Sequence, residues 1–100
     1  MSDIECCCAQ KHTPRDPELK KQLINRLNRI SGQIQGIARM IESERYCGDV
    51  LVQVAAAEKA LQNFGYLVLR DHMNSCLVEK LAAGDGDIID ETVDLIKQLK

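Results

Sequence analysis

Two long runs of apolar residues limit this chain to a helical fold. In each run the apolar side chains recur at steps of three and four positions, which is the period of an amphipathic α-helix. The runs consist of Leu19, Leu23, Leu27, Ile30, Ile34, Ile37 and Ile41, and of Val50, Val54, Ala57, Leu61, Phe64 and Val68. His72 and Cys76 continue the second run at the same spacing. Each run therefore predicts one long helix.

Capping signals set the expected ends of these two helices. The first helix is predicted to begin at Pro17, because Asp16 is a favourable N-cap residue and proline suits the first helical position. It is expected to end near Ser43. The second helix should run unbroken from Asp49 to Ala83, since no proline lies between them.

A glycine turn separates the second helix from a short third one. Gly84 and Gly86, in the sequence AAGDGD, suit a helix C-terminus followed by a turn. Asp87 then opens a predicted helix with one apolar side. That side is expected to carry Ile89, Val93, Ile96 and Leu99.

The composition agrees with an all-α protein of three helices per chain. Hydrophobic residues make up 45% of the chain, and there is no Trp and one Phe, so strand-forming residues are few. A chain of 100 residues forms one domain with only a modest core as a monomer. The long second helix would lack cover within one chain, so we expect at least a dimer.

Residues 1–15 differ from the rest of the chain. They show no apolar periodicity and contain Cys6, Cys7 and Cys8, which predicts a flexible, cysteine-rich arm ahead of a helical domain of residues 16–100. The N-terminus lacks the apolar core of a signal peptide, and no apolar stretch is long enough to span a membrane. We expect a cytoplasmic protein with no membrane partner. In that reducing compartment an odd number of cysteines, five, favours metal or thiol chemistry over disulfides.

His72 and Cys76 form an incomplete metal site. Residues four apart on a helix have Cβ atoms about 5–6 Å from each other, close enough for an imidazole and a thiolate to share one metal ion. Such a pair alone is more often part of a core. A third soft ligand, Cys47, lies 25 residues before His72, or about 38 Å along an unbroken helix. One chain therefore cannot close the site.

An antiparallel dimer removes this difficulty. If two copies of the second helix cross near Leu61, Cys47 of the partner subunit comes beside His72 and Cys76, and the two-fold axis makes a second identical site. Two thiolates and one imidazole suit Cu(I), with Zn(II) or Ni(II) as alternatives when a fourth ligand is present. That auxiliary ligand could come from the arm, which contains Cys6, Cys7, Cys8 and His12.

The sequence then resembles a known family. The segments NRLNRISGQIQGIARMIESERYC, DVLVQVAAAEKAL and HMNSC resemble the copper-sensitive operon repressors, which are small all-helical bacterial transcription factors. The resemblance extends from about Lys20 to the C-terminus. It implies a dimer with an antiparallel four-helix-bundle core, usually assembled as a tetramer. Such a protein binds operator double-stranded DNA when metal-free and leaves it when the inducer binds.

The resemblance also assigns roles to individual residues. Cys47, His72 and Cys76 match the Cu(I) ligands of the copper sensors. Tyr46 and Glu91 are similar to the pair that hydrogen-bonds the ligand histidine in that family.

A local excess of basic residues lies at the end of the arm and in the first half of the first helix. Residues 11–30 hold six basic and two acidic residues, although the whole chain has a net charge of -2. No helix-turn-helix signature is present, so DNA binding rests mainly on the resemblance. Gly32 and Gly36, four residues apart on the polar side, suggest close approach by another helix or by a phosphate backbone. The residues expected to face DNA are Lys20, Lys21, Arg26 and Arg29.

Three alternatives remain open at this level. A persulfide sensor of the same family would keep both cysteines but lack His72, and one nickel-sensing type adds an N-terminal histidine, for which His12 is the candidate. A dimeric copper-binding buffer protein would need no DNA-binding surface. Enzymatic activity is not expected, because the sequence has no constellation of base, nucleophile and electrophile.

Overall fold

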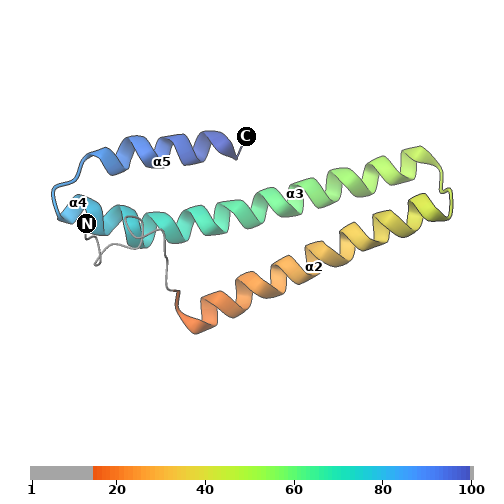
Figure 1. The fold of residues 1–100 in the computed structure, drawn as a ribbon, viewed down its shortest axis with the longest axis horizontal. Helices are drawn as coiled ribbons and strands as arrows, with labels where there is room; N and C mark the ends of the chain where they lie inside the picture. Colours follow the sequence, from red (N-terminus) through yellow and green to blue (C-terminus); the bar gives the residue numbers. More distant parts are fainter. Residues whose placement is uncertain (1–14, 100) are drawn as a thin grey trace. The chain divides into compact units, whose positions relative to one another are not determined.

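Every regular element in the described part of the chain, residues 15–99, is helical in the computed structural model. The elements are α2 (Pro17–Glu42), α3 (Cys47–His72), the π-helical turn η1 (Met73–Leu77), α4 (Val78–Ala82) and α5 (Asp87–Gln98) (Figure 1). Since no residue separates α3, η1 and α4, they form one continuous helical run. The expected all-α fold with three helices is therefore confirmed.

The end of α2 is a hydrogen-bonded turn in which a non-glycine residue is left-handed. The N–H of Arg45 donates to the carbonyl of Met40 (2.9 Å), and the N–H of Glu44 donates to that of Ile41 (3.1 Å). This is the Schellman pattern, which satisfies carbonyls at a helix end. Glu44 has a φ of 57°, a conformation that glycine adopts more easily.

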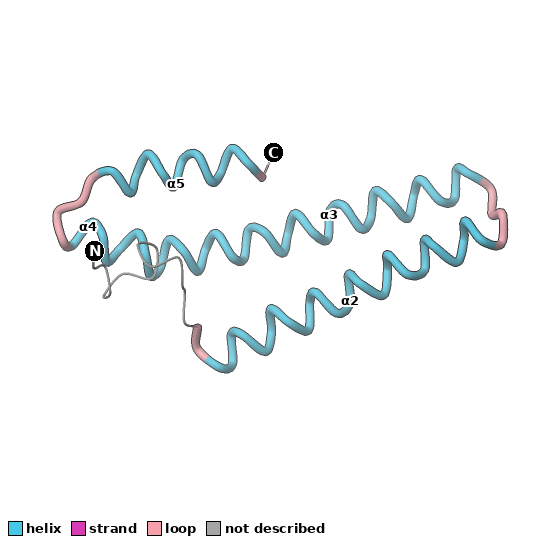
Figure 2. Tube along the Cα trace, viewed as in Figure 1, coloured by secondary structure: helices cyan, strands magenta, loops and turns pink. Residues whose placement is uncertain are grey.

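The second helical run begins at Cys47, two residues before the predicted start, and ends at Ala82. A second Schellman turn follows, in which Gly84 has a φ of 86° and the N–H of Asp85 donates to the carbonyl of Lys80 (2.9 Å). The predicted glycine stop is therefore confirmed. Figure 2 shows these two turns as the loops between the helices.

The described residues fall into two compact units, with the boundary inside α3. The first, Pro17–Phe64, contains α2 and the start of α3, and its buried residues are Leu23, Ile30 and Val50. The second contains Arg15, Asp16 and residues 65–99, and its buried residues are Cys76, Ile88 and Thr92. None of the described helices combines the length and apolar character needed to cross a membrane.

The buried side of α5 differs from the predicted one. Ile88 and Thr92 are 3% and 4% exposed, whereas Ile89 and Val93 are 50% and 43% exposed. The apolar side expected from the sequence, with Ile89 and Val93, is therefore not the side that is most buried within one chain. Two stripes overlap on this short helix, and the buried one includes a threonine, which an apolar pattern does not count.

Candidate metal centre

His72 and Cys76 lie on either side of a change in helix type. His72 is the last residue of α3, and Cys76 belongs to the π-helical turn η1. Cys76 is 1% exposed, so its side chain lies inside the second compact unit. π-helical turns are rare and are frequent at functional sites. The structure therefore places both predicted ligands within one short stretch, as the sequence spacing indicates.

The His72 ring is oriented by a buried hydroxyl on α5. His72 Nε2 lies 3.1 Å from Thr92 Oγ1, and Thr92 Oγ1 donates a hydrogen bond to the carbonyl of Ile88 (2.8 Å). Thr92 was not among the residues singled out from the sequence. A threonine on a helix carries no signal of this role unless the register of α5 against α3 is known.

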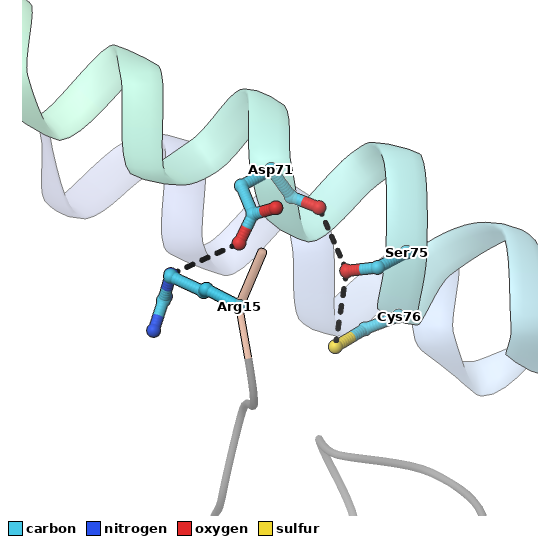
Figure 3. Close-up of polar contacts among 4 residues, drawn as sticks. All are labelled: Arg15, Asp71, Ser75 and Cys76. Carbon is cyan, nitrogen blue, oxygen red and sulfur yellow. Dashed lines mark hydrogen bonds and ion pairs between the residues drawn. The ribbon is translucent and has the colours of Figure 1, made fainter. Parts of the chain in front are cut away.

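The hydroxyl of Ser75 contacts both the backbone of α3 and the sulfur of Cys76. It donates to the carbonyl of Asp71 at 2.7 Å and lies 3.8 Å from Cys76 Sγ (Figure 3). A hydroxyl has one proton, and the short contact with the carbonyl takes it. The contact with sulfur is therefore weak, and Ser75 mainly supports the backbone between the two predicted ligands.

An ion pair lies directly beside this segment. Arg15 Nε is 3.1 Å from Asp71 Oδ2, and the two side chains are 28% and 17% exposed (Figure 3). The guanidinium and the carboxylate attract each other as opposite charges, but the N–H of Arg15 Nε is not aligned with Asp71 Oδ2 as in a hydrogen bond. Asp71 precedes His72, so the ion pair fixes the chain at the residue next to a predicted ligand.

Cys47 lies at the other end of the ligand helix. It is the first residue of α3 and has an exposed free thiol. In the described part of a single chain, no three His, Cys, Asp or Glu side chains are grouped closely enough to hold a metal ion. His72 and Cys76 thus share one helical stretch, whereas Cys47 forms no three-residue ligand group with them among the described residues of one chain.

The residues predicted to support the ligand histidine are both exposed. Tyr46 is 73% exposed, and its ring lies against the α-carbon of Gly48, where a side chain would overlap it. Glu91 is exposed on α5, next to Thr92. Contacts of Tyr46 or Glu91 with His72 therefore stay a prediction. The candidate auxiliary ligands lie outside the described residues, and they are Cys6, Cys7, Cys8 and His12.

The predicted DNA-facing residues are exposed on α2. Arg26 and Arg29 line a cavity of about 170 Å³ together with Gln33 and Asn63. None of the described residues around this cavity is acidic, so it presents two guanidinium groups and two amides. Lys20 and Lys21 lie in the first turns of the same helix.

Sequence comparisons identify relatives over most of the chain. Residues 19–98 match the family described as metal-sensitive transcriptional repressor. The copper-sensing transcriptional repressor CsoR of Bacillus subtilis is 42% identical over 80 residues, which is 79% of each chain. The copper-sensing transcriptional repressor RicR of Mycobacterium tuberculosis is 34% identical over 85 residues, or 81% of this chain and 88% of RicR.

Solved structures give the same result. The copper-sensing repressor CsoR with Cu(I) from Geobacillus thermodenitrificans matches with a TM-score of 0.80 and 39% identity, over 86% of this chain and 91% of that one. The nickel-responsive transcriptional regulator InrS matches with a TM-score of 0.71 and 34% identity, over 89% and 98%. All of these relatives are named as transcriptional regulators, in agreement with the expectation that the chain is not an enzyme. The chain therefore belongs to the metal-sensitive transcriptional repressor family.

Proposed function

We propose that this protein is a cytoplasmic, copper-responsive repressor that binds operator DNA when metal-free and releases it when Cu(I) binds. The observation that carries the proposal is the pair of His72 and Cys76 on one helical stretch, with Cys76 1% exposed and His72 oriented by Thr92. The similarity to copper-sensing repressors supports the choice of metal.

The donor atoms fit a soft cation. An imidazole and thiolates are the ligands that Cu(I) prefers, and the cysteines act in their reduced, deprotonated form. We propose that His72, Cys76 and Cys47 of the partner subunit hold the ion. When bound, the metal supplies bonds that join two subunits at each end of their long helices. We propose that Tyr46 and Glu91 transmit metal binding to the rest of the subunit, Tyr46 to the α2–α3 turn and Glu91 to α5.

Self-association is supported by the apolar surface of the first compact unit. In a single chain, five large aliphatic side chains of this unit are more than half exposed: Ile34, Ile41, Leu51, Val52 and Leu61. Exposed apolar side chains in such number are typical of a surface that another chain covers. An antiparallel dimer with a four-helix core, assembled further as a tetramer, would cover it and create the sites.

Contact with DNA is proposed to occur along α2. Arg26 and Arg29 can neutralise phosphate groups, and the amides of Gln33 and Asn63 in the same cavity can donate further hydrogen bonds. A symmetric assembly would repeat these residues, with Lys20 and Lys21, in every subunit. That repetition gives a basic surface to a chain whose net charge is -2.

A nickel sensor is the second candidate, because InrS also matches this chain. Ni(II) needs more ligands than the three proposed, and His12 is the candidate for the additional one. Competition titrations with Cu(I), Ni(II) and Zn(II) at a known dimer concentration separate these metals. The copper sensor is expected to hold Cu(I) in the presence of excess Ni(II).

DNA release is the direct test of the proposal. Fluorescence anisotropy with a labelled fragment from upstream of the protein's own gene should show that Cu(I) lowers DNA affinity by roughly 10- to 100-fold. By linkage, the DNA should weaken Cu(I) binding by the same factor. Binding of Cu(I) without DNA affinity in either state would instead identify a copper buffer.

A further inference from the structure

The two cysteines in the described part of the chain differ in their redox state. Cys47 has a free thiol, whereas Cys76 is disulfide-bonded. Cys76 is therefore not joined to Cys47, and the other cysteines of the chain are Cys6, Cys7 and Cys8. These three lie outside the described residues and are not needed for the three-ligand Cu(I) site. They are the candidates for the partner of Cys76.

The end of the arm is anchored close to Cys76. Arg15 Nε lies 3.1 Å from Asp71 Oδ2, and Asp71 precedes Cys76 by five residues on the same helical run. Five residues correspond to roughly 8 Å along a helix. Figure 3 shows Arg15 and the sulfur of Cys76 on the same side of this run. The seven residues from Cys8 to Arg15 can span up to about 25 Å, so an arm cysteine can reach Cys76 within one chain.

We propose that Cys76 forms a reversible disulfide with a cysteine of the arm in the same chain, and that this bond prevents metal binding under oxidising conditions. Disulfides in cytoplasmic proteins are usually transient and redox-sensing rather than structural. The disulfide-bonded state of Cys76 and the anchoring of Arg15 on Asp71 are two separate observations that support the pairing. The inference rests on the proposed function only in taking Cys76 as a metal ligand.

The bond forms by two thiol–disulfide exchanges, with a low-molecular-weight disulfide as the oxidant. The thiolate of an arm cysteine attacks one sulfur of the oxidant, which gives a mixed disulfide and releases one thiolate. The thiolate of Cys76 then attacks the arm sulfur of the mixed disulfide and releases the second thiolate. The protein loses two protons and two electrons, and the oxidant becomes two thiols. The arm cysteine reacts first, because Cys76 is 1% exposed and is poorly accessible to molecules from solution.

Oxidation of Cys76 removes one of the three proposed Cu(I) ligands. The thiolate is the form of cysteine that binds metals, and a sulfur in a disulfide carries no such charge. The oxidised protein is therefore expected to bind Cu(I) weakly and, where the proposed function holds, to stay on DNA when Cu(I) is present. Bound Cu(I) is expected in turn to protect Cys76 from oxidation.

Disulfide mapping tests the pairing directly. Metal-free, reduced full-length protein is treated with oxidised glutathione, its remaining thiols are alkylated, and tryptic peptides are analysed by mass spectrometry without reduction. Trypsin cuts after lysine and arginine, so the arm cysteines, Cys47 and Cys76 fall in three separate peptides, residues 1–11, 46–59 and 71–80. We expect residues 1–11 linked to 71–80, in protein that runs as a monomer on a non-reducing denaturing gel. A link of 46–59 to 71–80, a link between chains, or an oxidised arm without a link to Cys76 would overturn the proposal.

The rate of disulfide formation tests the anchoring of the arm. Arg15→Gln should slow the link to Cys76 by roughly 5-fold, because the arm then spends less time beside that residue. Arg39→Gln is the matched control, since it removes one exposed guanidinium from α2 and should leave the rate unchanged. Equal rates in Arg15→Gln and the unmodified protein would contradict the role of the ion pair in this reaction.

Anaerobic Cu(I) competition titrations test the consequence for the metal site. The oxidised protein should bind Cu(I) at least about 10-fold more weakly than the reduced protein. A triple variant, Cys6→Ser, Cys7→Ser and Cys8→Ser, should bind Cu(I) equally well before and after treatment with oxidised glutathione. Unchanged affinity in the oxidised unmodified protein would contradict the proposal. The same loss in the triple variant would contradict it too, because the arm would not be needed.

The outcomes separate this proposal from the proposed function. If the disulfide forms and weakens Cu(I) binding, but Cu(I) leaves the DNA affinity of the reduced protein unchanged, the proposed function fails and the redox control of the metal site stands. If Cu(I) releases the reduced protein from DNA and no link to Cys76 forms, the redox control fails and the proposed function stands.

Discussion

The side chain of Leu99 lies against the bare α-carbon of Gly65, so close that a methyl group added there would overlap Leu99 Cδ2. Gly65 therefore lets the end of α5 approach α3. We expect Gly65→Ala to lower the free energy of unfolding by about 1–3 kcal/mol through overpacking. Urea denaturation measures this change. A Gly65→Ala, Leu99→Ala double variant should lose less than the sum of the single variants, and simple additivity would show that the contact does not matter.

The ion pair between Arg15 and Asp71, next to His72, is expected to make a small electrostatic contribution to the free energy of unfolding. Both side chains are partly exposed, so we expect Arg15→Gln and Asp71→Asn each to destabilise the protein by only about 1 kcal/mol. Unfolding at low and high salt should show a smaller loss at high salt. Equal losses under both conditions would indicate that packing, rather than charge, holds Arg15.

The left-handed conformation of Glu44 predicts a stabilising substitution. Glu44→Gly should raise the free energy of unfolding by about 0.5–1 kcal/mol, because glycine adopts this φ without the steric penalty. Glu58→Gly, at an exposed position inside α3, is the matched control and should lower it by about 1 kcal/mol. Loss of stability in both variants would contradict the assigned turn. Cu(I) affinity should be unchanged in Glu44→Gly, since Glu44 is not part of the proposed site.

His72 separates a metal sensor from a sulfur sensor. We expect His72→Ala to weaken the Cu(I)-dependent release of DNA by at least about 10-fold, because the imidazole is one of three proposed ligands. A persulfide sensor that works through Cys47 and Cys76 would keep most of its response. Anisotropy titrations with Cu(I) and with a persulfide donor, on the same variant, distinguish the two. A variant that responds to Cu(I) as the unmodified protein does would exclude His72 from the site.

The sequence predicted the helices well because their ends carry strong local signals. Pro17 begins α2 and Gly84 ends the second helical run, as expected from capping preferences. The π-helical turn after His72 was not predicted, since no residue pattern distinguishes it from α-helix. The left-handed Glu44 was also missed, because this conformation is usually marked by glycine or asparagine.

The candidate site was predictable only in part. His72 and Cys76 follow from helical spacing, which is a local property. Thr92 did not follow, because its contact with His72 depends on which of the two stripes of α5 is buried. The buried stripe contains Ile88 and Thr92, and choosing it requires knowledge of the packed structure.

The central claim is that each metal site takes ligands from two subunits, and mixed dimers test it most directly. A Cys47→Ser subunit and a Cys76→Ser subunit, carrying different affinity tags, each form homodimers with no complete site. In the mixed dimer, His72 and Cys76 of the first subunit meet an intact Cys47 of the partner subunit. Cu(I) titration of the purified mixed dimer should give about one tightly bound ion per dimer. If the mixed dimer binds Cu(I) as weakly as both parent homodimers, the site does not lie between subunits.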